Sequence, residues 1–237
     1  MLIKKIYRTV VPLRFREKLK EYQEYRGYQN LRHQEGHVYQ RFDVTQSIFV
    51  HIPKAGGISI IKSLYGEQAN GFGHPTYQRF LKLFGKSDYN KYFKFTFVRN
   101  PWDRLYSAYS FLKKGGMNHL DKAFCNEVLI DYPDFESFVM NWLNADNIEN
   151  WIHFKPQYQF ITDRNMALVV DFVGKFENFE SDFKIIAEKL KMPVELGHHN
   201  KTNNSKNTSY REVYTPEMKE KIRSLYKDDI SLFDYQF

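Results

Sequence analysis

Three short apolar runs, each followed directly by a helical pattern, constrain the fold of this chain more than any other feature. The runs cover residues 47–52, 91–98 and 166–176. Phe93, Phe95 and Phe97 alternate with Lys94 and Thr96, as in a β-strand. Strands that alternate with helices indicate a parallel sheet with helices on both faces. We therefore predict a three-layer α/β/α fold with a central parallel sheet.

The ends of the expected helices are also marked. Asn100 suits the cap of a helix, Pro101 its first position and Asp103 its first turn. Thr215 with Pro216 repeats this signal at the start of one last helix, which we expect over residues 215–233. Residues 1–45 are polar and charged, and we expect an N-terminal helical extension there. Residues 46–237 are then predicted to form one domain, since no internal boundary is visible.

Charge and cysteine content limit the partners. The chain has 237 residues and a net charge of +7, which favours anionic partners. Cys125 is the only cysteine, so we predict neither an intrachain disulfide nor a cysteine-based metal site. No apolar run reaches the roughly 18 residues of a membrane span. The basic N-terminus lacks the pattern of a secretory signal. We expect a cytoplasmic protein whose N-terminal segment can rest on a membrane surface.

The stretch FVHIPKAGGISI, residues 49–60, predicts an anion-binding loop. It places Gly56 and Gly57 between a strand and a helix, where backbone N–H groups can surround a phosphate. Lys54 adds a charge and Ser59 a hydroxyl. The Walker pattern has its lysine after the glycines, whereas Lys54 precedes them. The second strand ends at Arg99 rather than at a carboxylate that could hold magnesium. These features disfavour a metal-dependent kinase.

Arg99 and Ser107 predict a second anion site. Arg99 closes the second strand, and Ser107 lies seven residues beyond Asn100. Seven residues of α-helix return to nearly the same azimuth, about 10 Å along the axis. Arginine binds phosphate with two parallel bonds, and a serine hydroxyl adds a third. Two anion sites at neighbouring strand ends indicate a ligand with two separated phosphate groups.

These two stretches resemble the cofactor motifs of sulfotransferases that use 3′-phosphoadenosine 5′-phosphosulfate (PAPS). FVHIPKAGGISI and FKFTFVRNPWDRLYSAY are closest to the carbohydrate sulfotransferases of the chondroitin and HNK-1 types and their bacterial relatives. The resemblance runs from about residue 46 to the C-terminus. It implies sulfuryl transfer from PAPS to a hydroxyl of a carbohydrate or glycolipid acceptor, without a metal, by a P-loop-like phosphosulfate-binding loop.

The resemblance also implies roles for matched positions. The loop would hold the 5′-phosphosulfate, with Lys54 also acting at the leaving group, and Arg99 and Ser107 would hold the 3′-phosphate. The loop residues are Lys54, Ala55, Gly56, Gly57, Ile58 and Ser59. Ile58 departs from the family, which usually has threonine there, so one hydroxyl contact is missing while the backbone N–H remains.

A histidine is the usual general base near neutral pH. His74 lies between the two motifs, where related carbohydrate sulfotransferases carry a histidine, and we predict it as the base. His51 is expected to be structural. His153 and Gln157 are candidates for the acceptor cleft.

The polar loop at residues 197–210 is expected either to fold over the nucleotide or to remain a solvated loop. In the first case Lys201 or Arg211 would lie near a phosphate. His198 and His199 are expected to be solvated.

Two other functions stay open at this stage. One is a P-loop-like small-molecule kinase that uses ATP. The other is a non-catalytic basic module that binds acidic polysaccharide or nucleic acid, which the charge and the aromatic content permit. The absence of a basic cluster or an RNA-binding motif argues against a nucleic-acid partner. The sequence does not determine the acceptor or the oligomeric state.

Overall fold

A parallel sheet of three strands organises the protein. In the computed structural model, which describes residues 12–70, 73–193, 197 and 209–237, these strands are β1 (Ser47–Val50), β2 (Phe93–Val98) and β3 (Phe172–Lys175). Their order is β1-β2-β3, and Phe95 of β2 pairs with Phe49 on one side and Phe172 on the other. The predicted parallel sheet is confirmed.

The third strand is shorter than the sequence indicated. The apolar run at residues 166–176 suggested a long strand covered on both faces, but β3 has four residues and only Gly174 is buried. β3 is an edge strand that pairs with β2 alone. The start of the run belongs to a turn, in which Asp163 Oδ1 accepts from the N–H groups of Asn165 and Ala167.

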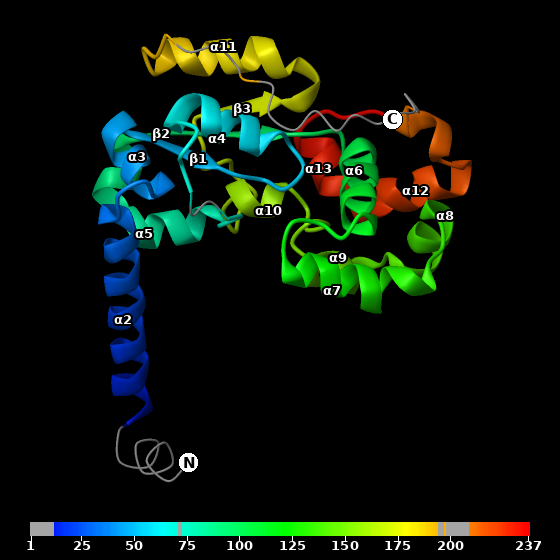
Figure 1. Ribbon diagram of the computed structural model, residues 1–237, viewed down its shortest axis with the longest axis horizontal. Helices are drawn as coiled ribbons and strands as arrows, with labels where there is room; N and C mark the ends of the chain where they lie inside the picture. Colours follow the sequence, from blue (N-terminus) through cyan, green and yellow to red (C-terminus); the bar gives the residue numbers. More distant parts are fainter. Residues whose placement is uncertain (1–11, 71–72, 194–196, 198–208) are drawn as a thin grey trace.

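Six helices lie on the sheet side of the molecule. They are α2 (Leu13–His33), α3 (Val38–Thr45), α4 (Gly57–Tyr65), α5 (Tyr77–Lys91), α10 (Tyr158–Ile161) and α11 (Phe179–Lys189). Figure 1 shows α11 on one side of the sheet and α5 and α10 on the other, which gives the predicted three layers. A short 3-10 turn, η3 (Phe176–Asn178), joins β3 to α11.

A second group of helices follows β2 and returns at the end of the chain. It comprises α6 (Pro101–Lys113), α7 (His119–Glu127), η1 (Leu129–Asp131), α8 (Phe135–Ser137), the π-helical turn η2 (Phe138–Trp142), α9 (Ala145–Asn150), η4 (Tyr210–Val213), α12 (Pro216–Leu225) and α13 (Lys227–Leu232). The single helix expected after Thr215 is therefore two helices, which are separated at Tyr226.

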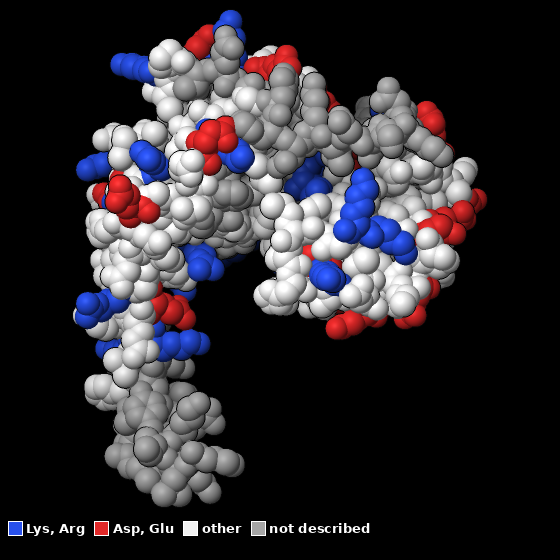
Figure 2. Space-filling view, viewed as in Figure 1, with Lys and Arg blue, Asp and Glu red and all other residues white. Residues whose placement is uncertain are grey.

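The buried core consists of two clusters, which correspond to the sheet side and to the second group of helices. One buried cluster surrounds the sheet and includes Phe95 and Phe97 of β2. The other is built by the second group of helices and includes Trp102 and Phe138. Helix α6 begins at the end of β2 and packs its apolar face into the second cluster. Residues at the start of α6 therefore lie where the two clusters meet, and Figure 2 shows a hollow there with Lys and Arg atoms inside it.

The N-terminal extension is helical, as predicted. Figure 1 shows α2 extending away from the rest of the protein, and Phe15, Leu19 and Tyr22 on it are exposed. Helix α3 instead joins the sheet cluster through Val38 and Phe42. The predicted domain boundary after residue 45 stays a prediction. In the described residues, no helix combines the length and apolar composition needed to cross a membrane.

Candidate active site

The loop between β1 and α4 curls tightly because two glycines allow it. Gly56 has a left-handed φ of 81° and is the N-cap of α4. A Cβ on Gly57 would lie 2.0 Å from the ring of His51, and one on Gly56 would lie 2.6 Å from the ring of Phe179. No side chain of the described residues caps α4, and an uncapped helix N-terminus can bind an anion through its backbone N–H groups.

Two arginines of the second motif donate hydrogen bonds to backbone carbonyls of this loop. Arg104 Nε donates to the carbonyl of Pro53 at 2.9 Å, and Arg99 Nη1 donates to the carbonyl of Lys54 at 3.1 Å. These bonds stabilise Lys54 at a φ of 67°, which is unusual for a residue with a side chain. Burial lowers the pKa of Arg104, and its Nη2 has no hydrogen-bond partner within the described residues.

The Lys54 side chain turns toward α6. Its Nζ lies 3.9 Å from the ring centroid of Phe111. Burial lowers the pKa of Lys54 to about 8, and the nearby Arg99 acts in the same direction. The lysine is therefore still mostly charged at neutral pH, but its charge is weakly solvated. Such a charge interacts more strongly with a bound anion than a surface lysine does.

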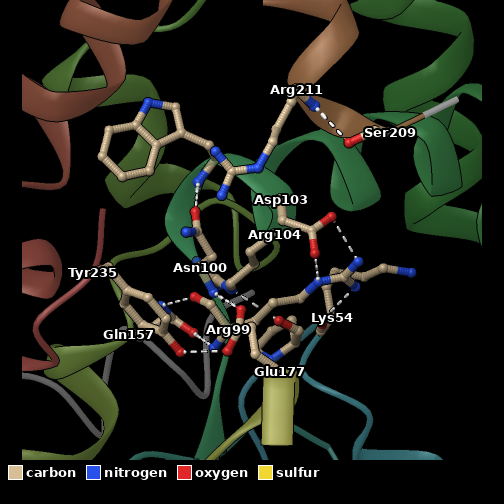
Figure 3. Close-up of polar contacts among 12 residues, drawn as sticks. Lys54, Arg99, Asn100, Asp103, Arg104, Gln157, Glu177, Ser209, Arg211 and Tyr235 are labelled. Carbon is tan, nitrogen blue, oxygen red and sulfur yellow. Dashed lines mark hydrogen bonds and ion pairs between the residues drawn. The ribbon is translucent and has the colours of Figure 1, made fainter. Parts of the chain in front are cut away.

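Arg99 is fixed at the centre of the network in Figure 3. Its Nε and Nη2 each donate to the Asp103 carboxylate at 2.8 Å. Its backbone N–H and carbonyl both bond to the Gln157 side chain, at 2.9 and 2.8 Å. Of the five N–H donors of a guanidinium, three are used in these contacts and in the bond to Lys54. No described residue accepts a hydrogen bond from the other two. Ser107 lies further along α6 and is half-buried.

One ring nitrogen of His74 is hydrogen-bonded, and the other has no hydrogen-bond partner among the described residues. Its Nδ1 lies 3.0 Å from the carbonyl oxygen of His51. Because a carbonyl only accepts, neutral His74 carries its proton on Nδ1 and a lone pair on Nε2. No described residue bonds to Nε2. Burial lowers the pKa of His74 to about 4, so the ring is neutral at physiological pH and able to accept a proton.

A buried histidine–carboxylate pair lies behind His74. The rings of His74 and His153 are 6.0 Å apart, and His153 Nε2 lies 3.1 Å from Asp121 Oδ1. The other carboxylate oxygen of Asp121 accepts from the N–H of Met117 and from Asn118 Nδ2, at 3.0 Å each. Burial lowers the pKa of His153, although Asp121 opposes this shift. His153 is thus a buried, oriented ring rather than a residue that lines an open cleft.

Comparison with known proteins fits this geometry. A model of the sulfotransferase family matches residues 42–236. The chain belongs to the sulfotransferase family. An uncharacterized protein of Archaeoglobus fulgidus is 30% identical over 131 residues, which are 54% of this chain and 91% of that protein. Carbohydrate sulfotransferase 14 of Danio rerio is 30% identical over 115 residues, 43% of this chain. The match spans 31% of that longer relative. No solved structure gives a significant match.

The structure of this sulfotransferase brings most of the predicted residues together. Lys54, Arg99 and the loop glycines meet at the ends of β1 and β2. Ala55 and Ser59 are buried within the same loop and first turn, and Ile58 is half-buried. Gln157 is fully buried and positions Arg99, so it does not line a cleft. His51 packs against His74 with ring centroids 4.3 Å apart, which agrees with a structural role.

Three residues of the sulfotransferase site were not predicted from the sequence. Asp103 had only been read as a first-turn acid, although its spacing of four from Arg99 could have indicated the ion pair. Arg104 and Asp121 gave no local signal. His198, His199 and Lys201 lie outside the described residues. Arg211 contacts the rings of Tyr210 and Phe237. No group of three side chains suited to a metal ion occurs in the part of the chain that is described.

Proposed function

We propose that this sulfotransferase transfers a sulfuryl group from PAPS to a hydroxyl of a carbohydrate. The observation that carries the proposal is the uncapped, glycine-lined start of α4 with Lys54 beside it, held against Arg99 by a backbone bond. One end of this arrangement offers N–H groups and an ammonium. The other offers two guanidinium N–H donors, so it suits a ligand with two separated anionic groups.

The residues present fit the two ends of PAPS. The N–H groups of Gly57, Ile58 and Ser59 and the Lys54 ammonium would bind the 5′-phosphosulfate. The free N–H groups of Arg99 and the Ser107 hydroxyl would bind the 3′-phosphate. Arg104 would support the first site, because its bond to the Pro53 carbonyl fixes the loop. When bound, PAPS supplies an activated sulfuryl group on a good leaving phosphate.

His74 would act as the general base. Its Nε2 accepts the proton of the acceptor hydroxyl while that oxygen forms its bond to sulfur. The bond between sulfur and the bridging phosphate oxygen breaks, and the phosphate keeps the electron pair near Lys54. The low pKa of free His74 makes it a weak base, but an anionic donor nearby favours its protonated form. The Asp121 carboxylate acts in the same direction.

The carbohydrate acceptor rests on the relative named carbohydrate sulfotransferase 14. The chain covers only part of that protein, so the identity of the sugar does not follow from the match. The described residues do not favour ATP as the donor, because β2 ends at Val98 and Arg99 follows it where a magnesium-binding carboxylate would be expected.

Ligand-induced thermal stabilisation tests the donor. We expect adenosine 3′,5′-bisphosphate, the product of PAPS, to raise the melting temperature with micromolar affinity. Binding at one hundred times Kd would stabilise the fold by about 2.7 kcal/mol. ATP with magnesium should give a much smaller shift. Stabilisation by ATP–magnesium alone would refute the PAPS proposal.

The base is tested by His74→Ala with His119→Ala as the control, because His119 is an exposed histidine on α7. We expect His74→Ala to lower the rate of radiolabelled sulfate transfer from PAPS to a glycan extract by about 10²–10⁴-fold. Adenosine 3′,5′-bisphosphate binding should be retained. Full activity of His74→Ala would remove His74 as the base.

A further inference from the structure

A pocket of about 260 Å³ opens beside His74. Its wall includes Leu31 and His37 from the N-terminal extension, Arg79 from α5, and Ile152 after α9. His74 also lies against the carbonyl of His51 at the end of β1, so the same ring borders both the pocket and the phosphate loop. A molecule in this pocket would therefore lie next to the proposed base.

The extension builds one wall of the pocket. Leu31, His37 and Tyr39 all precede residue 42, where the match to the family model begins. This wall is fixed rather than loosely attached. The N–H of Val38 donates to the carbonyl of Asn70 at 2.9 Å, and the N–H of Asn70 donates to Gly36 at 3.2 Å. The pocket thus combines residues inside the matched range with residues that precede it.

Two side chains of the pocket, His37 and Arg79, can donate hydrogen bonds to a ligand. His37 Nδ1 accepts the N–H of Tyr39 at 3.2 Å, which places the ring proton on Nε2. No described carboxylate pairs with Arg79, whose Cζ lies 5.1 Å from the ring centroid of Tyr28. Arg32 of α2 differs from Arg79 in this respect, because it forms ion pairs with Asp43 and Asp88. No carboxylate is among the lining residues of the pocket.

We infer that this pocket is the acceptor subsite and that it binds one sugar residue carrying an anionic substituent. This inference rests on the proposed function. Arg79 would pair with the carboxylate or sulfate of the sugar, and His37 would donate to one of its oxygens. The pocket is below the usual range for ligand pockets, about 300–1,000 Å³, so it holds a single ring rather than a chain. A hydroxyl of that ring would then lie next to His74, which lines the pocket.

Saturation-transfer NMR on the full chain tests the inference. The protein is first saturated with adenosine 3′,5′-bisphosphate, and three probes are then compared: methyl β-D-glucuronide, N-acetylglucosamine 6-sulfate and methyl β-D-glucoside. We expect binding of at least one anionic probe and about tenfold weaker binding of the neutral one, since a charge-assisted contact is lost. The first two probes distinguish a carboxylate from a sulfate.

Variants locate the binding. Arg79→Gln should weaken the anionic probe about tenfold, whereas Lys82→Gln, an exposed change on the same helix, should not. Leu31→Trp should block every probe by filling the pocket. Both Arg79→Gln and Leu31→Trp should leave adenosine 3′,5′-bisphosphate affinity unchanged.

Three outcomes overturn the subsite. The first is equal binding of anionic and neutral sugars, and the second is no binding of any sugar. The third is anionic binding that Arg79→Gln and Leu31→Trp do not alter. Failure of adenosine 3′,5′-bisphosphate to bind is a different result, because it counts against the proposed donor while the sugar titration without nucleotide still reports on the pocket.

Discussion

The ends of β1 and β2 have the same order of elements but differ in electrostatics. Each strand leads into a helix. Helix α4 has Gly56 at its cap, and no side chain of the described residues caps it. Helix α6 is capped by Asn100, whose side chain accepts from Trp102 N at 3.1 Å, and Pro101 lacks an N–H. Asp103 adds a negative charge to its first turn.

The difference assigns a separate means of binding to each end. The β1 end can bind an anion through backbone N–H groups, which need space and tight curvature. The start of α6 is already satisfied and is acidic, so an anion at the β2 end must be bound by side chains such as Arg99. We therefore expect anion binding at the β1 end to be lost when a side-chain atom is added to the loop. Anion binding at the β2 end should weaken when a charged side chain is removed.

Adding one methyl group at the β1 end should have the largest effect. Gly57→Ala would place Cβ 2.0 Å from the ring of His51, so the loop or the histidine must move. We expect calorimetry to detect no binding of adenosine 3′,5′-bisphosphate, and stability to fall by about 1–3 kcal/mol. The control is Gly27→Ala on α2, where nothing lies within 4 Å. Normal binding by Gly57→Ala would contradict the backbone mechanism.

Removing the charge at the β2 end should have the next largest effect. Arg99→Ala should weaken adenosine 3′,5′-bisphosphate binding by about 1.5–3 kcal/mol, because a charge-assisted contact is lost. Arg99→Lys should recover only part of this, since lysine lacks the planar fork. Arg164→Ala, an exposed arginine in a turn, serves as the control. Unchanged affinity in Arg99→Ala would remove this residue from the phosphate site.

The pH dependence of binding should separate the two ends further. The pKa of Lys54 is lowered to about 8, so Lys54 is charged below that pH and becomes neutral above it. Affinity for adenosine 3′,5′-bisphosphate should fall as pH rises, by up to about tenfold per unit above pH 8. Isothermal titration across this range measures the fall. In Lys54→Arg the fall should disappear, because arginine stays charged. A persistent fall would assign it to another group.

The smallest effect on binding should come from the α6 cap. Asn100→Ala removes the bond to Trp102 N and should cost about 1 kcal/mol of folding stability. Since this N-terminus is not expected to bind the anion, affinity for adenosine 3′,5′-bisphosphate should stay within about twofold. Chemical denaturation measures the first quantity and calorimetry the second. A large loss of affinity would mean that both strand ends bind through backbone groups.

Local patterns were sufficient for the elements and for part of the site. Alternating Phe93, Phe95 and Phe97 predicted β2, and the Asn100–Pro101 pair predicted the start of α6. The edge position of β3 was not predictable in this way, because an apolar run does not state how many neighbours a strand has. The break at Tyr226 was missed for a similar reason. Its ring is buried against the second cluster, and its hydroxyl donates to the carbonyl of Phe154.

The sequence by itself determined the strand, the glycine pair and the helix that follows, because these depend on φ, side-chain volume and periodicity within a few residues. Only the tertiary structure decided which distant side chains bond to these elements and which protonation states the site residues have. Arg104 reaches the Pro53 carbonyl across 51 positions, and Asp121 pairs with His153 across 32. Such contacts depend on how α6 and α7 pack against the sheet. The protonation of Lys54 and His74 depends on burial, which packing alone creates.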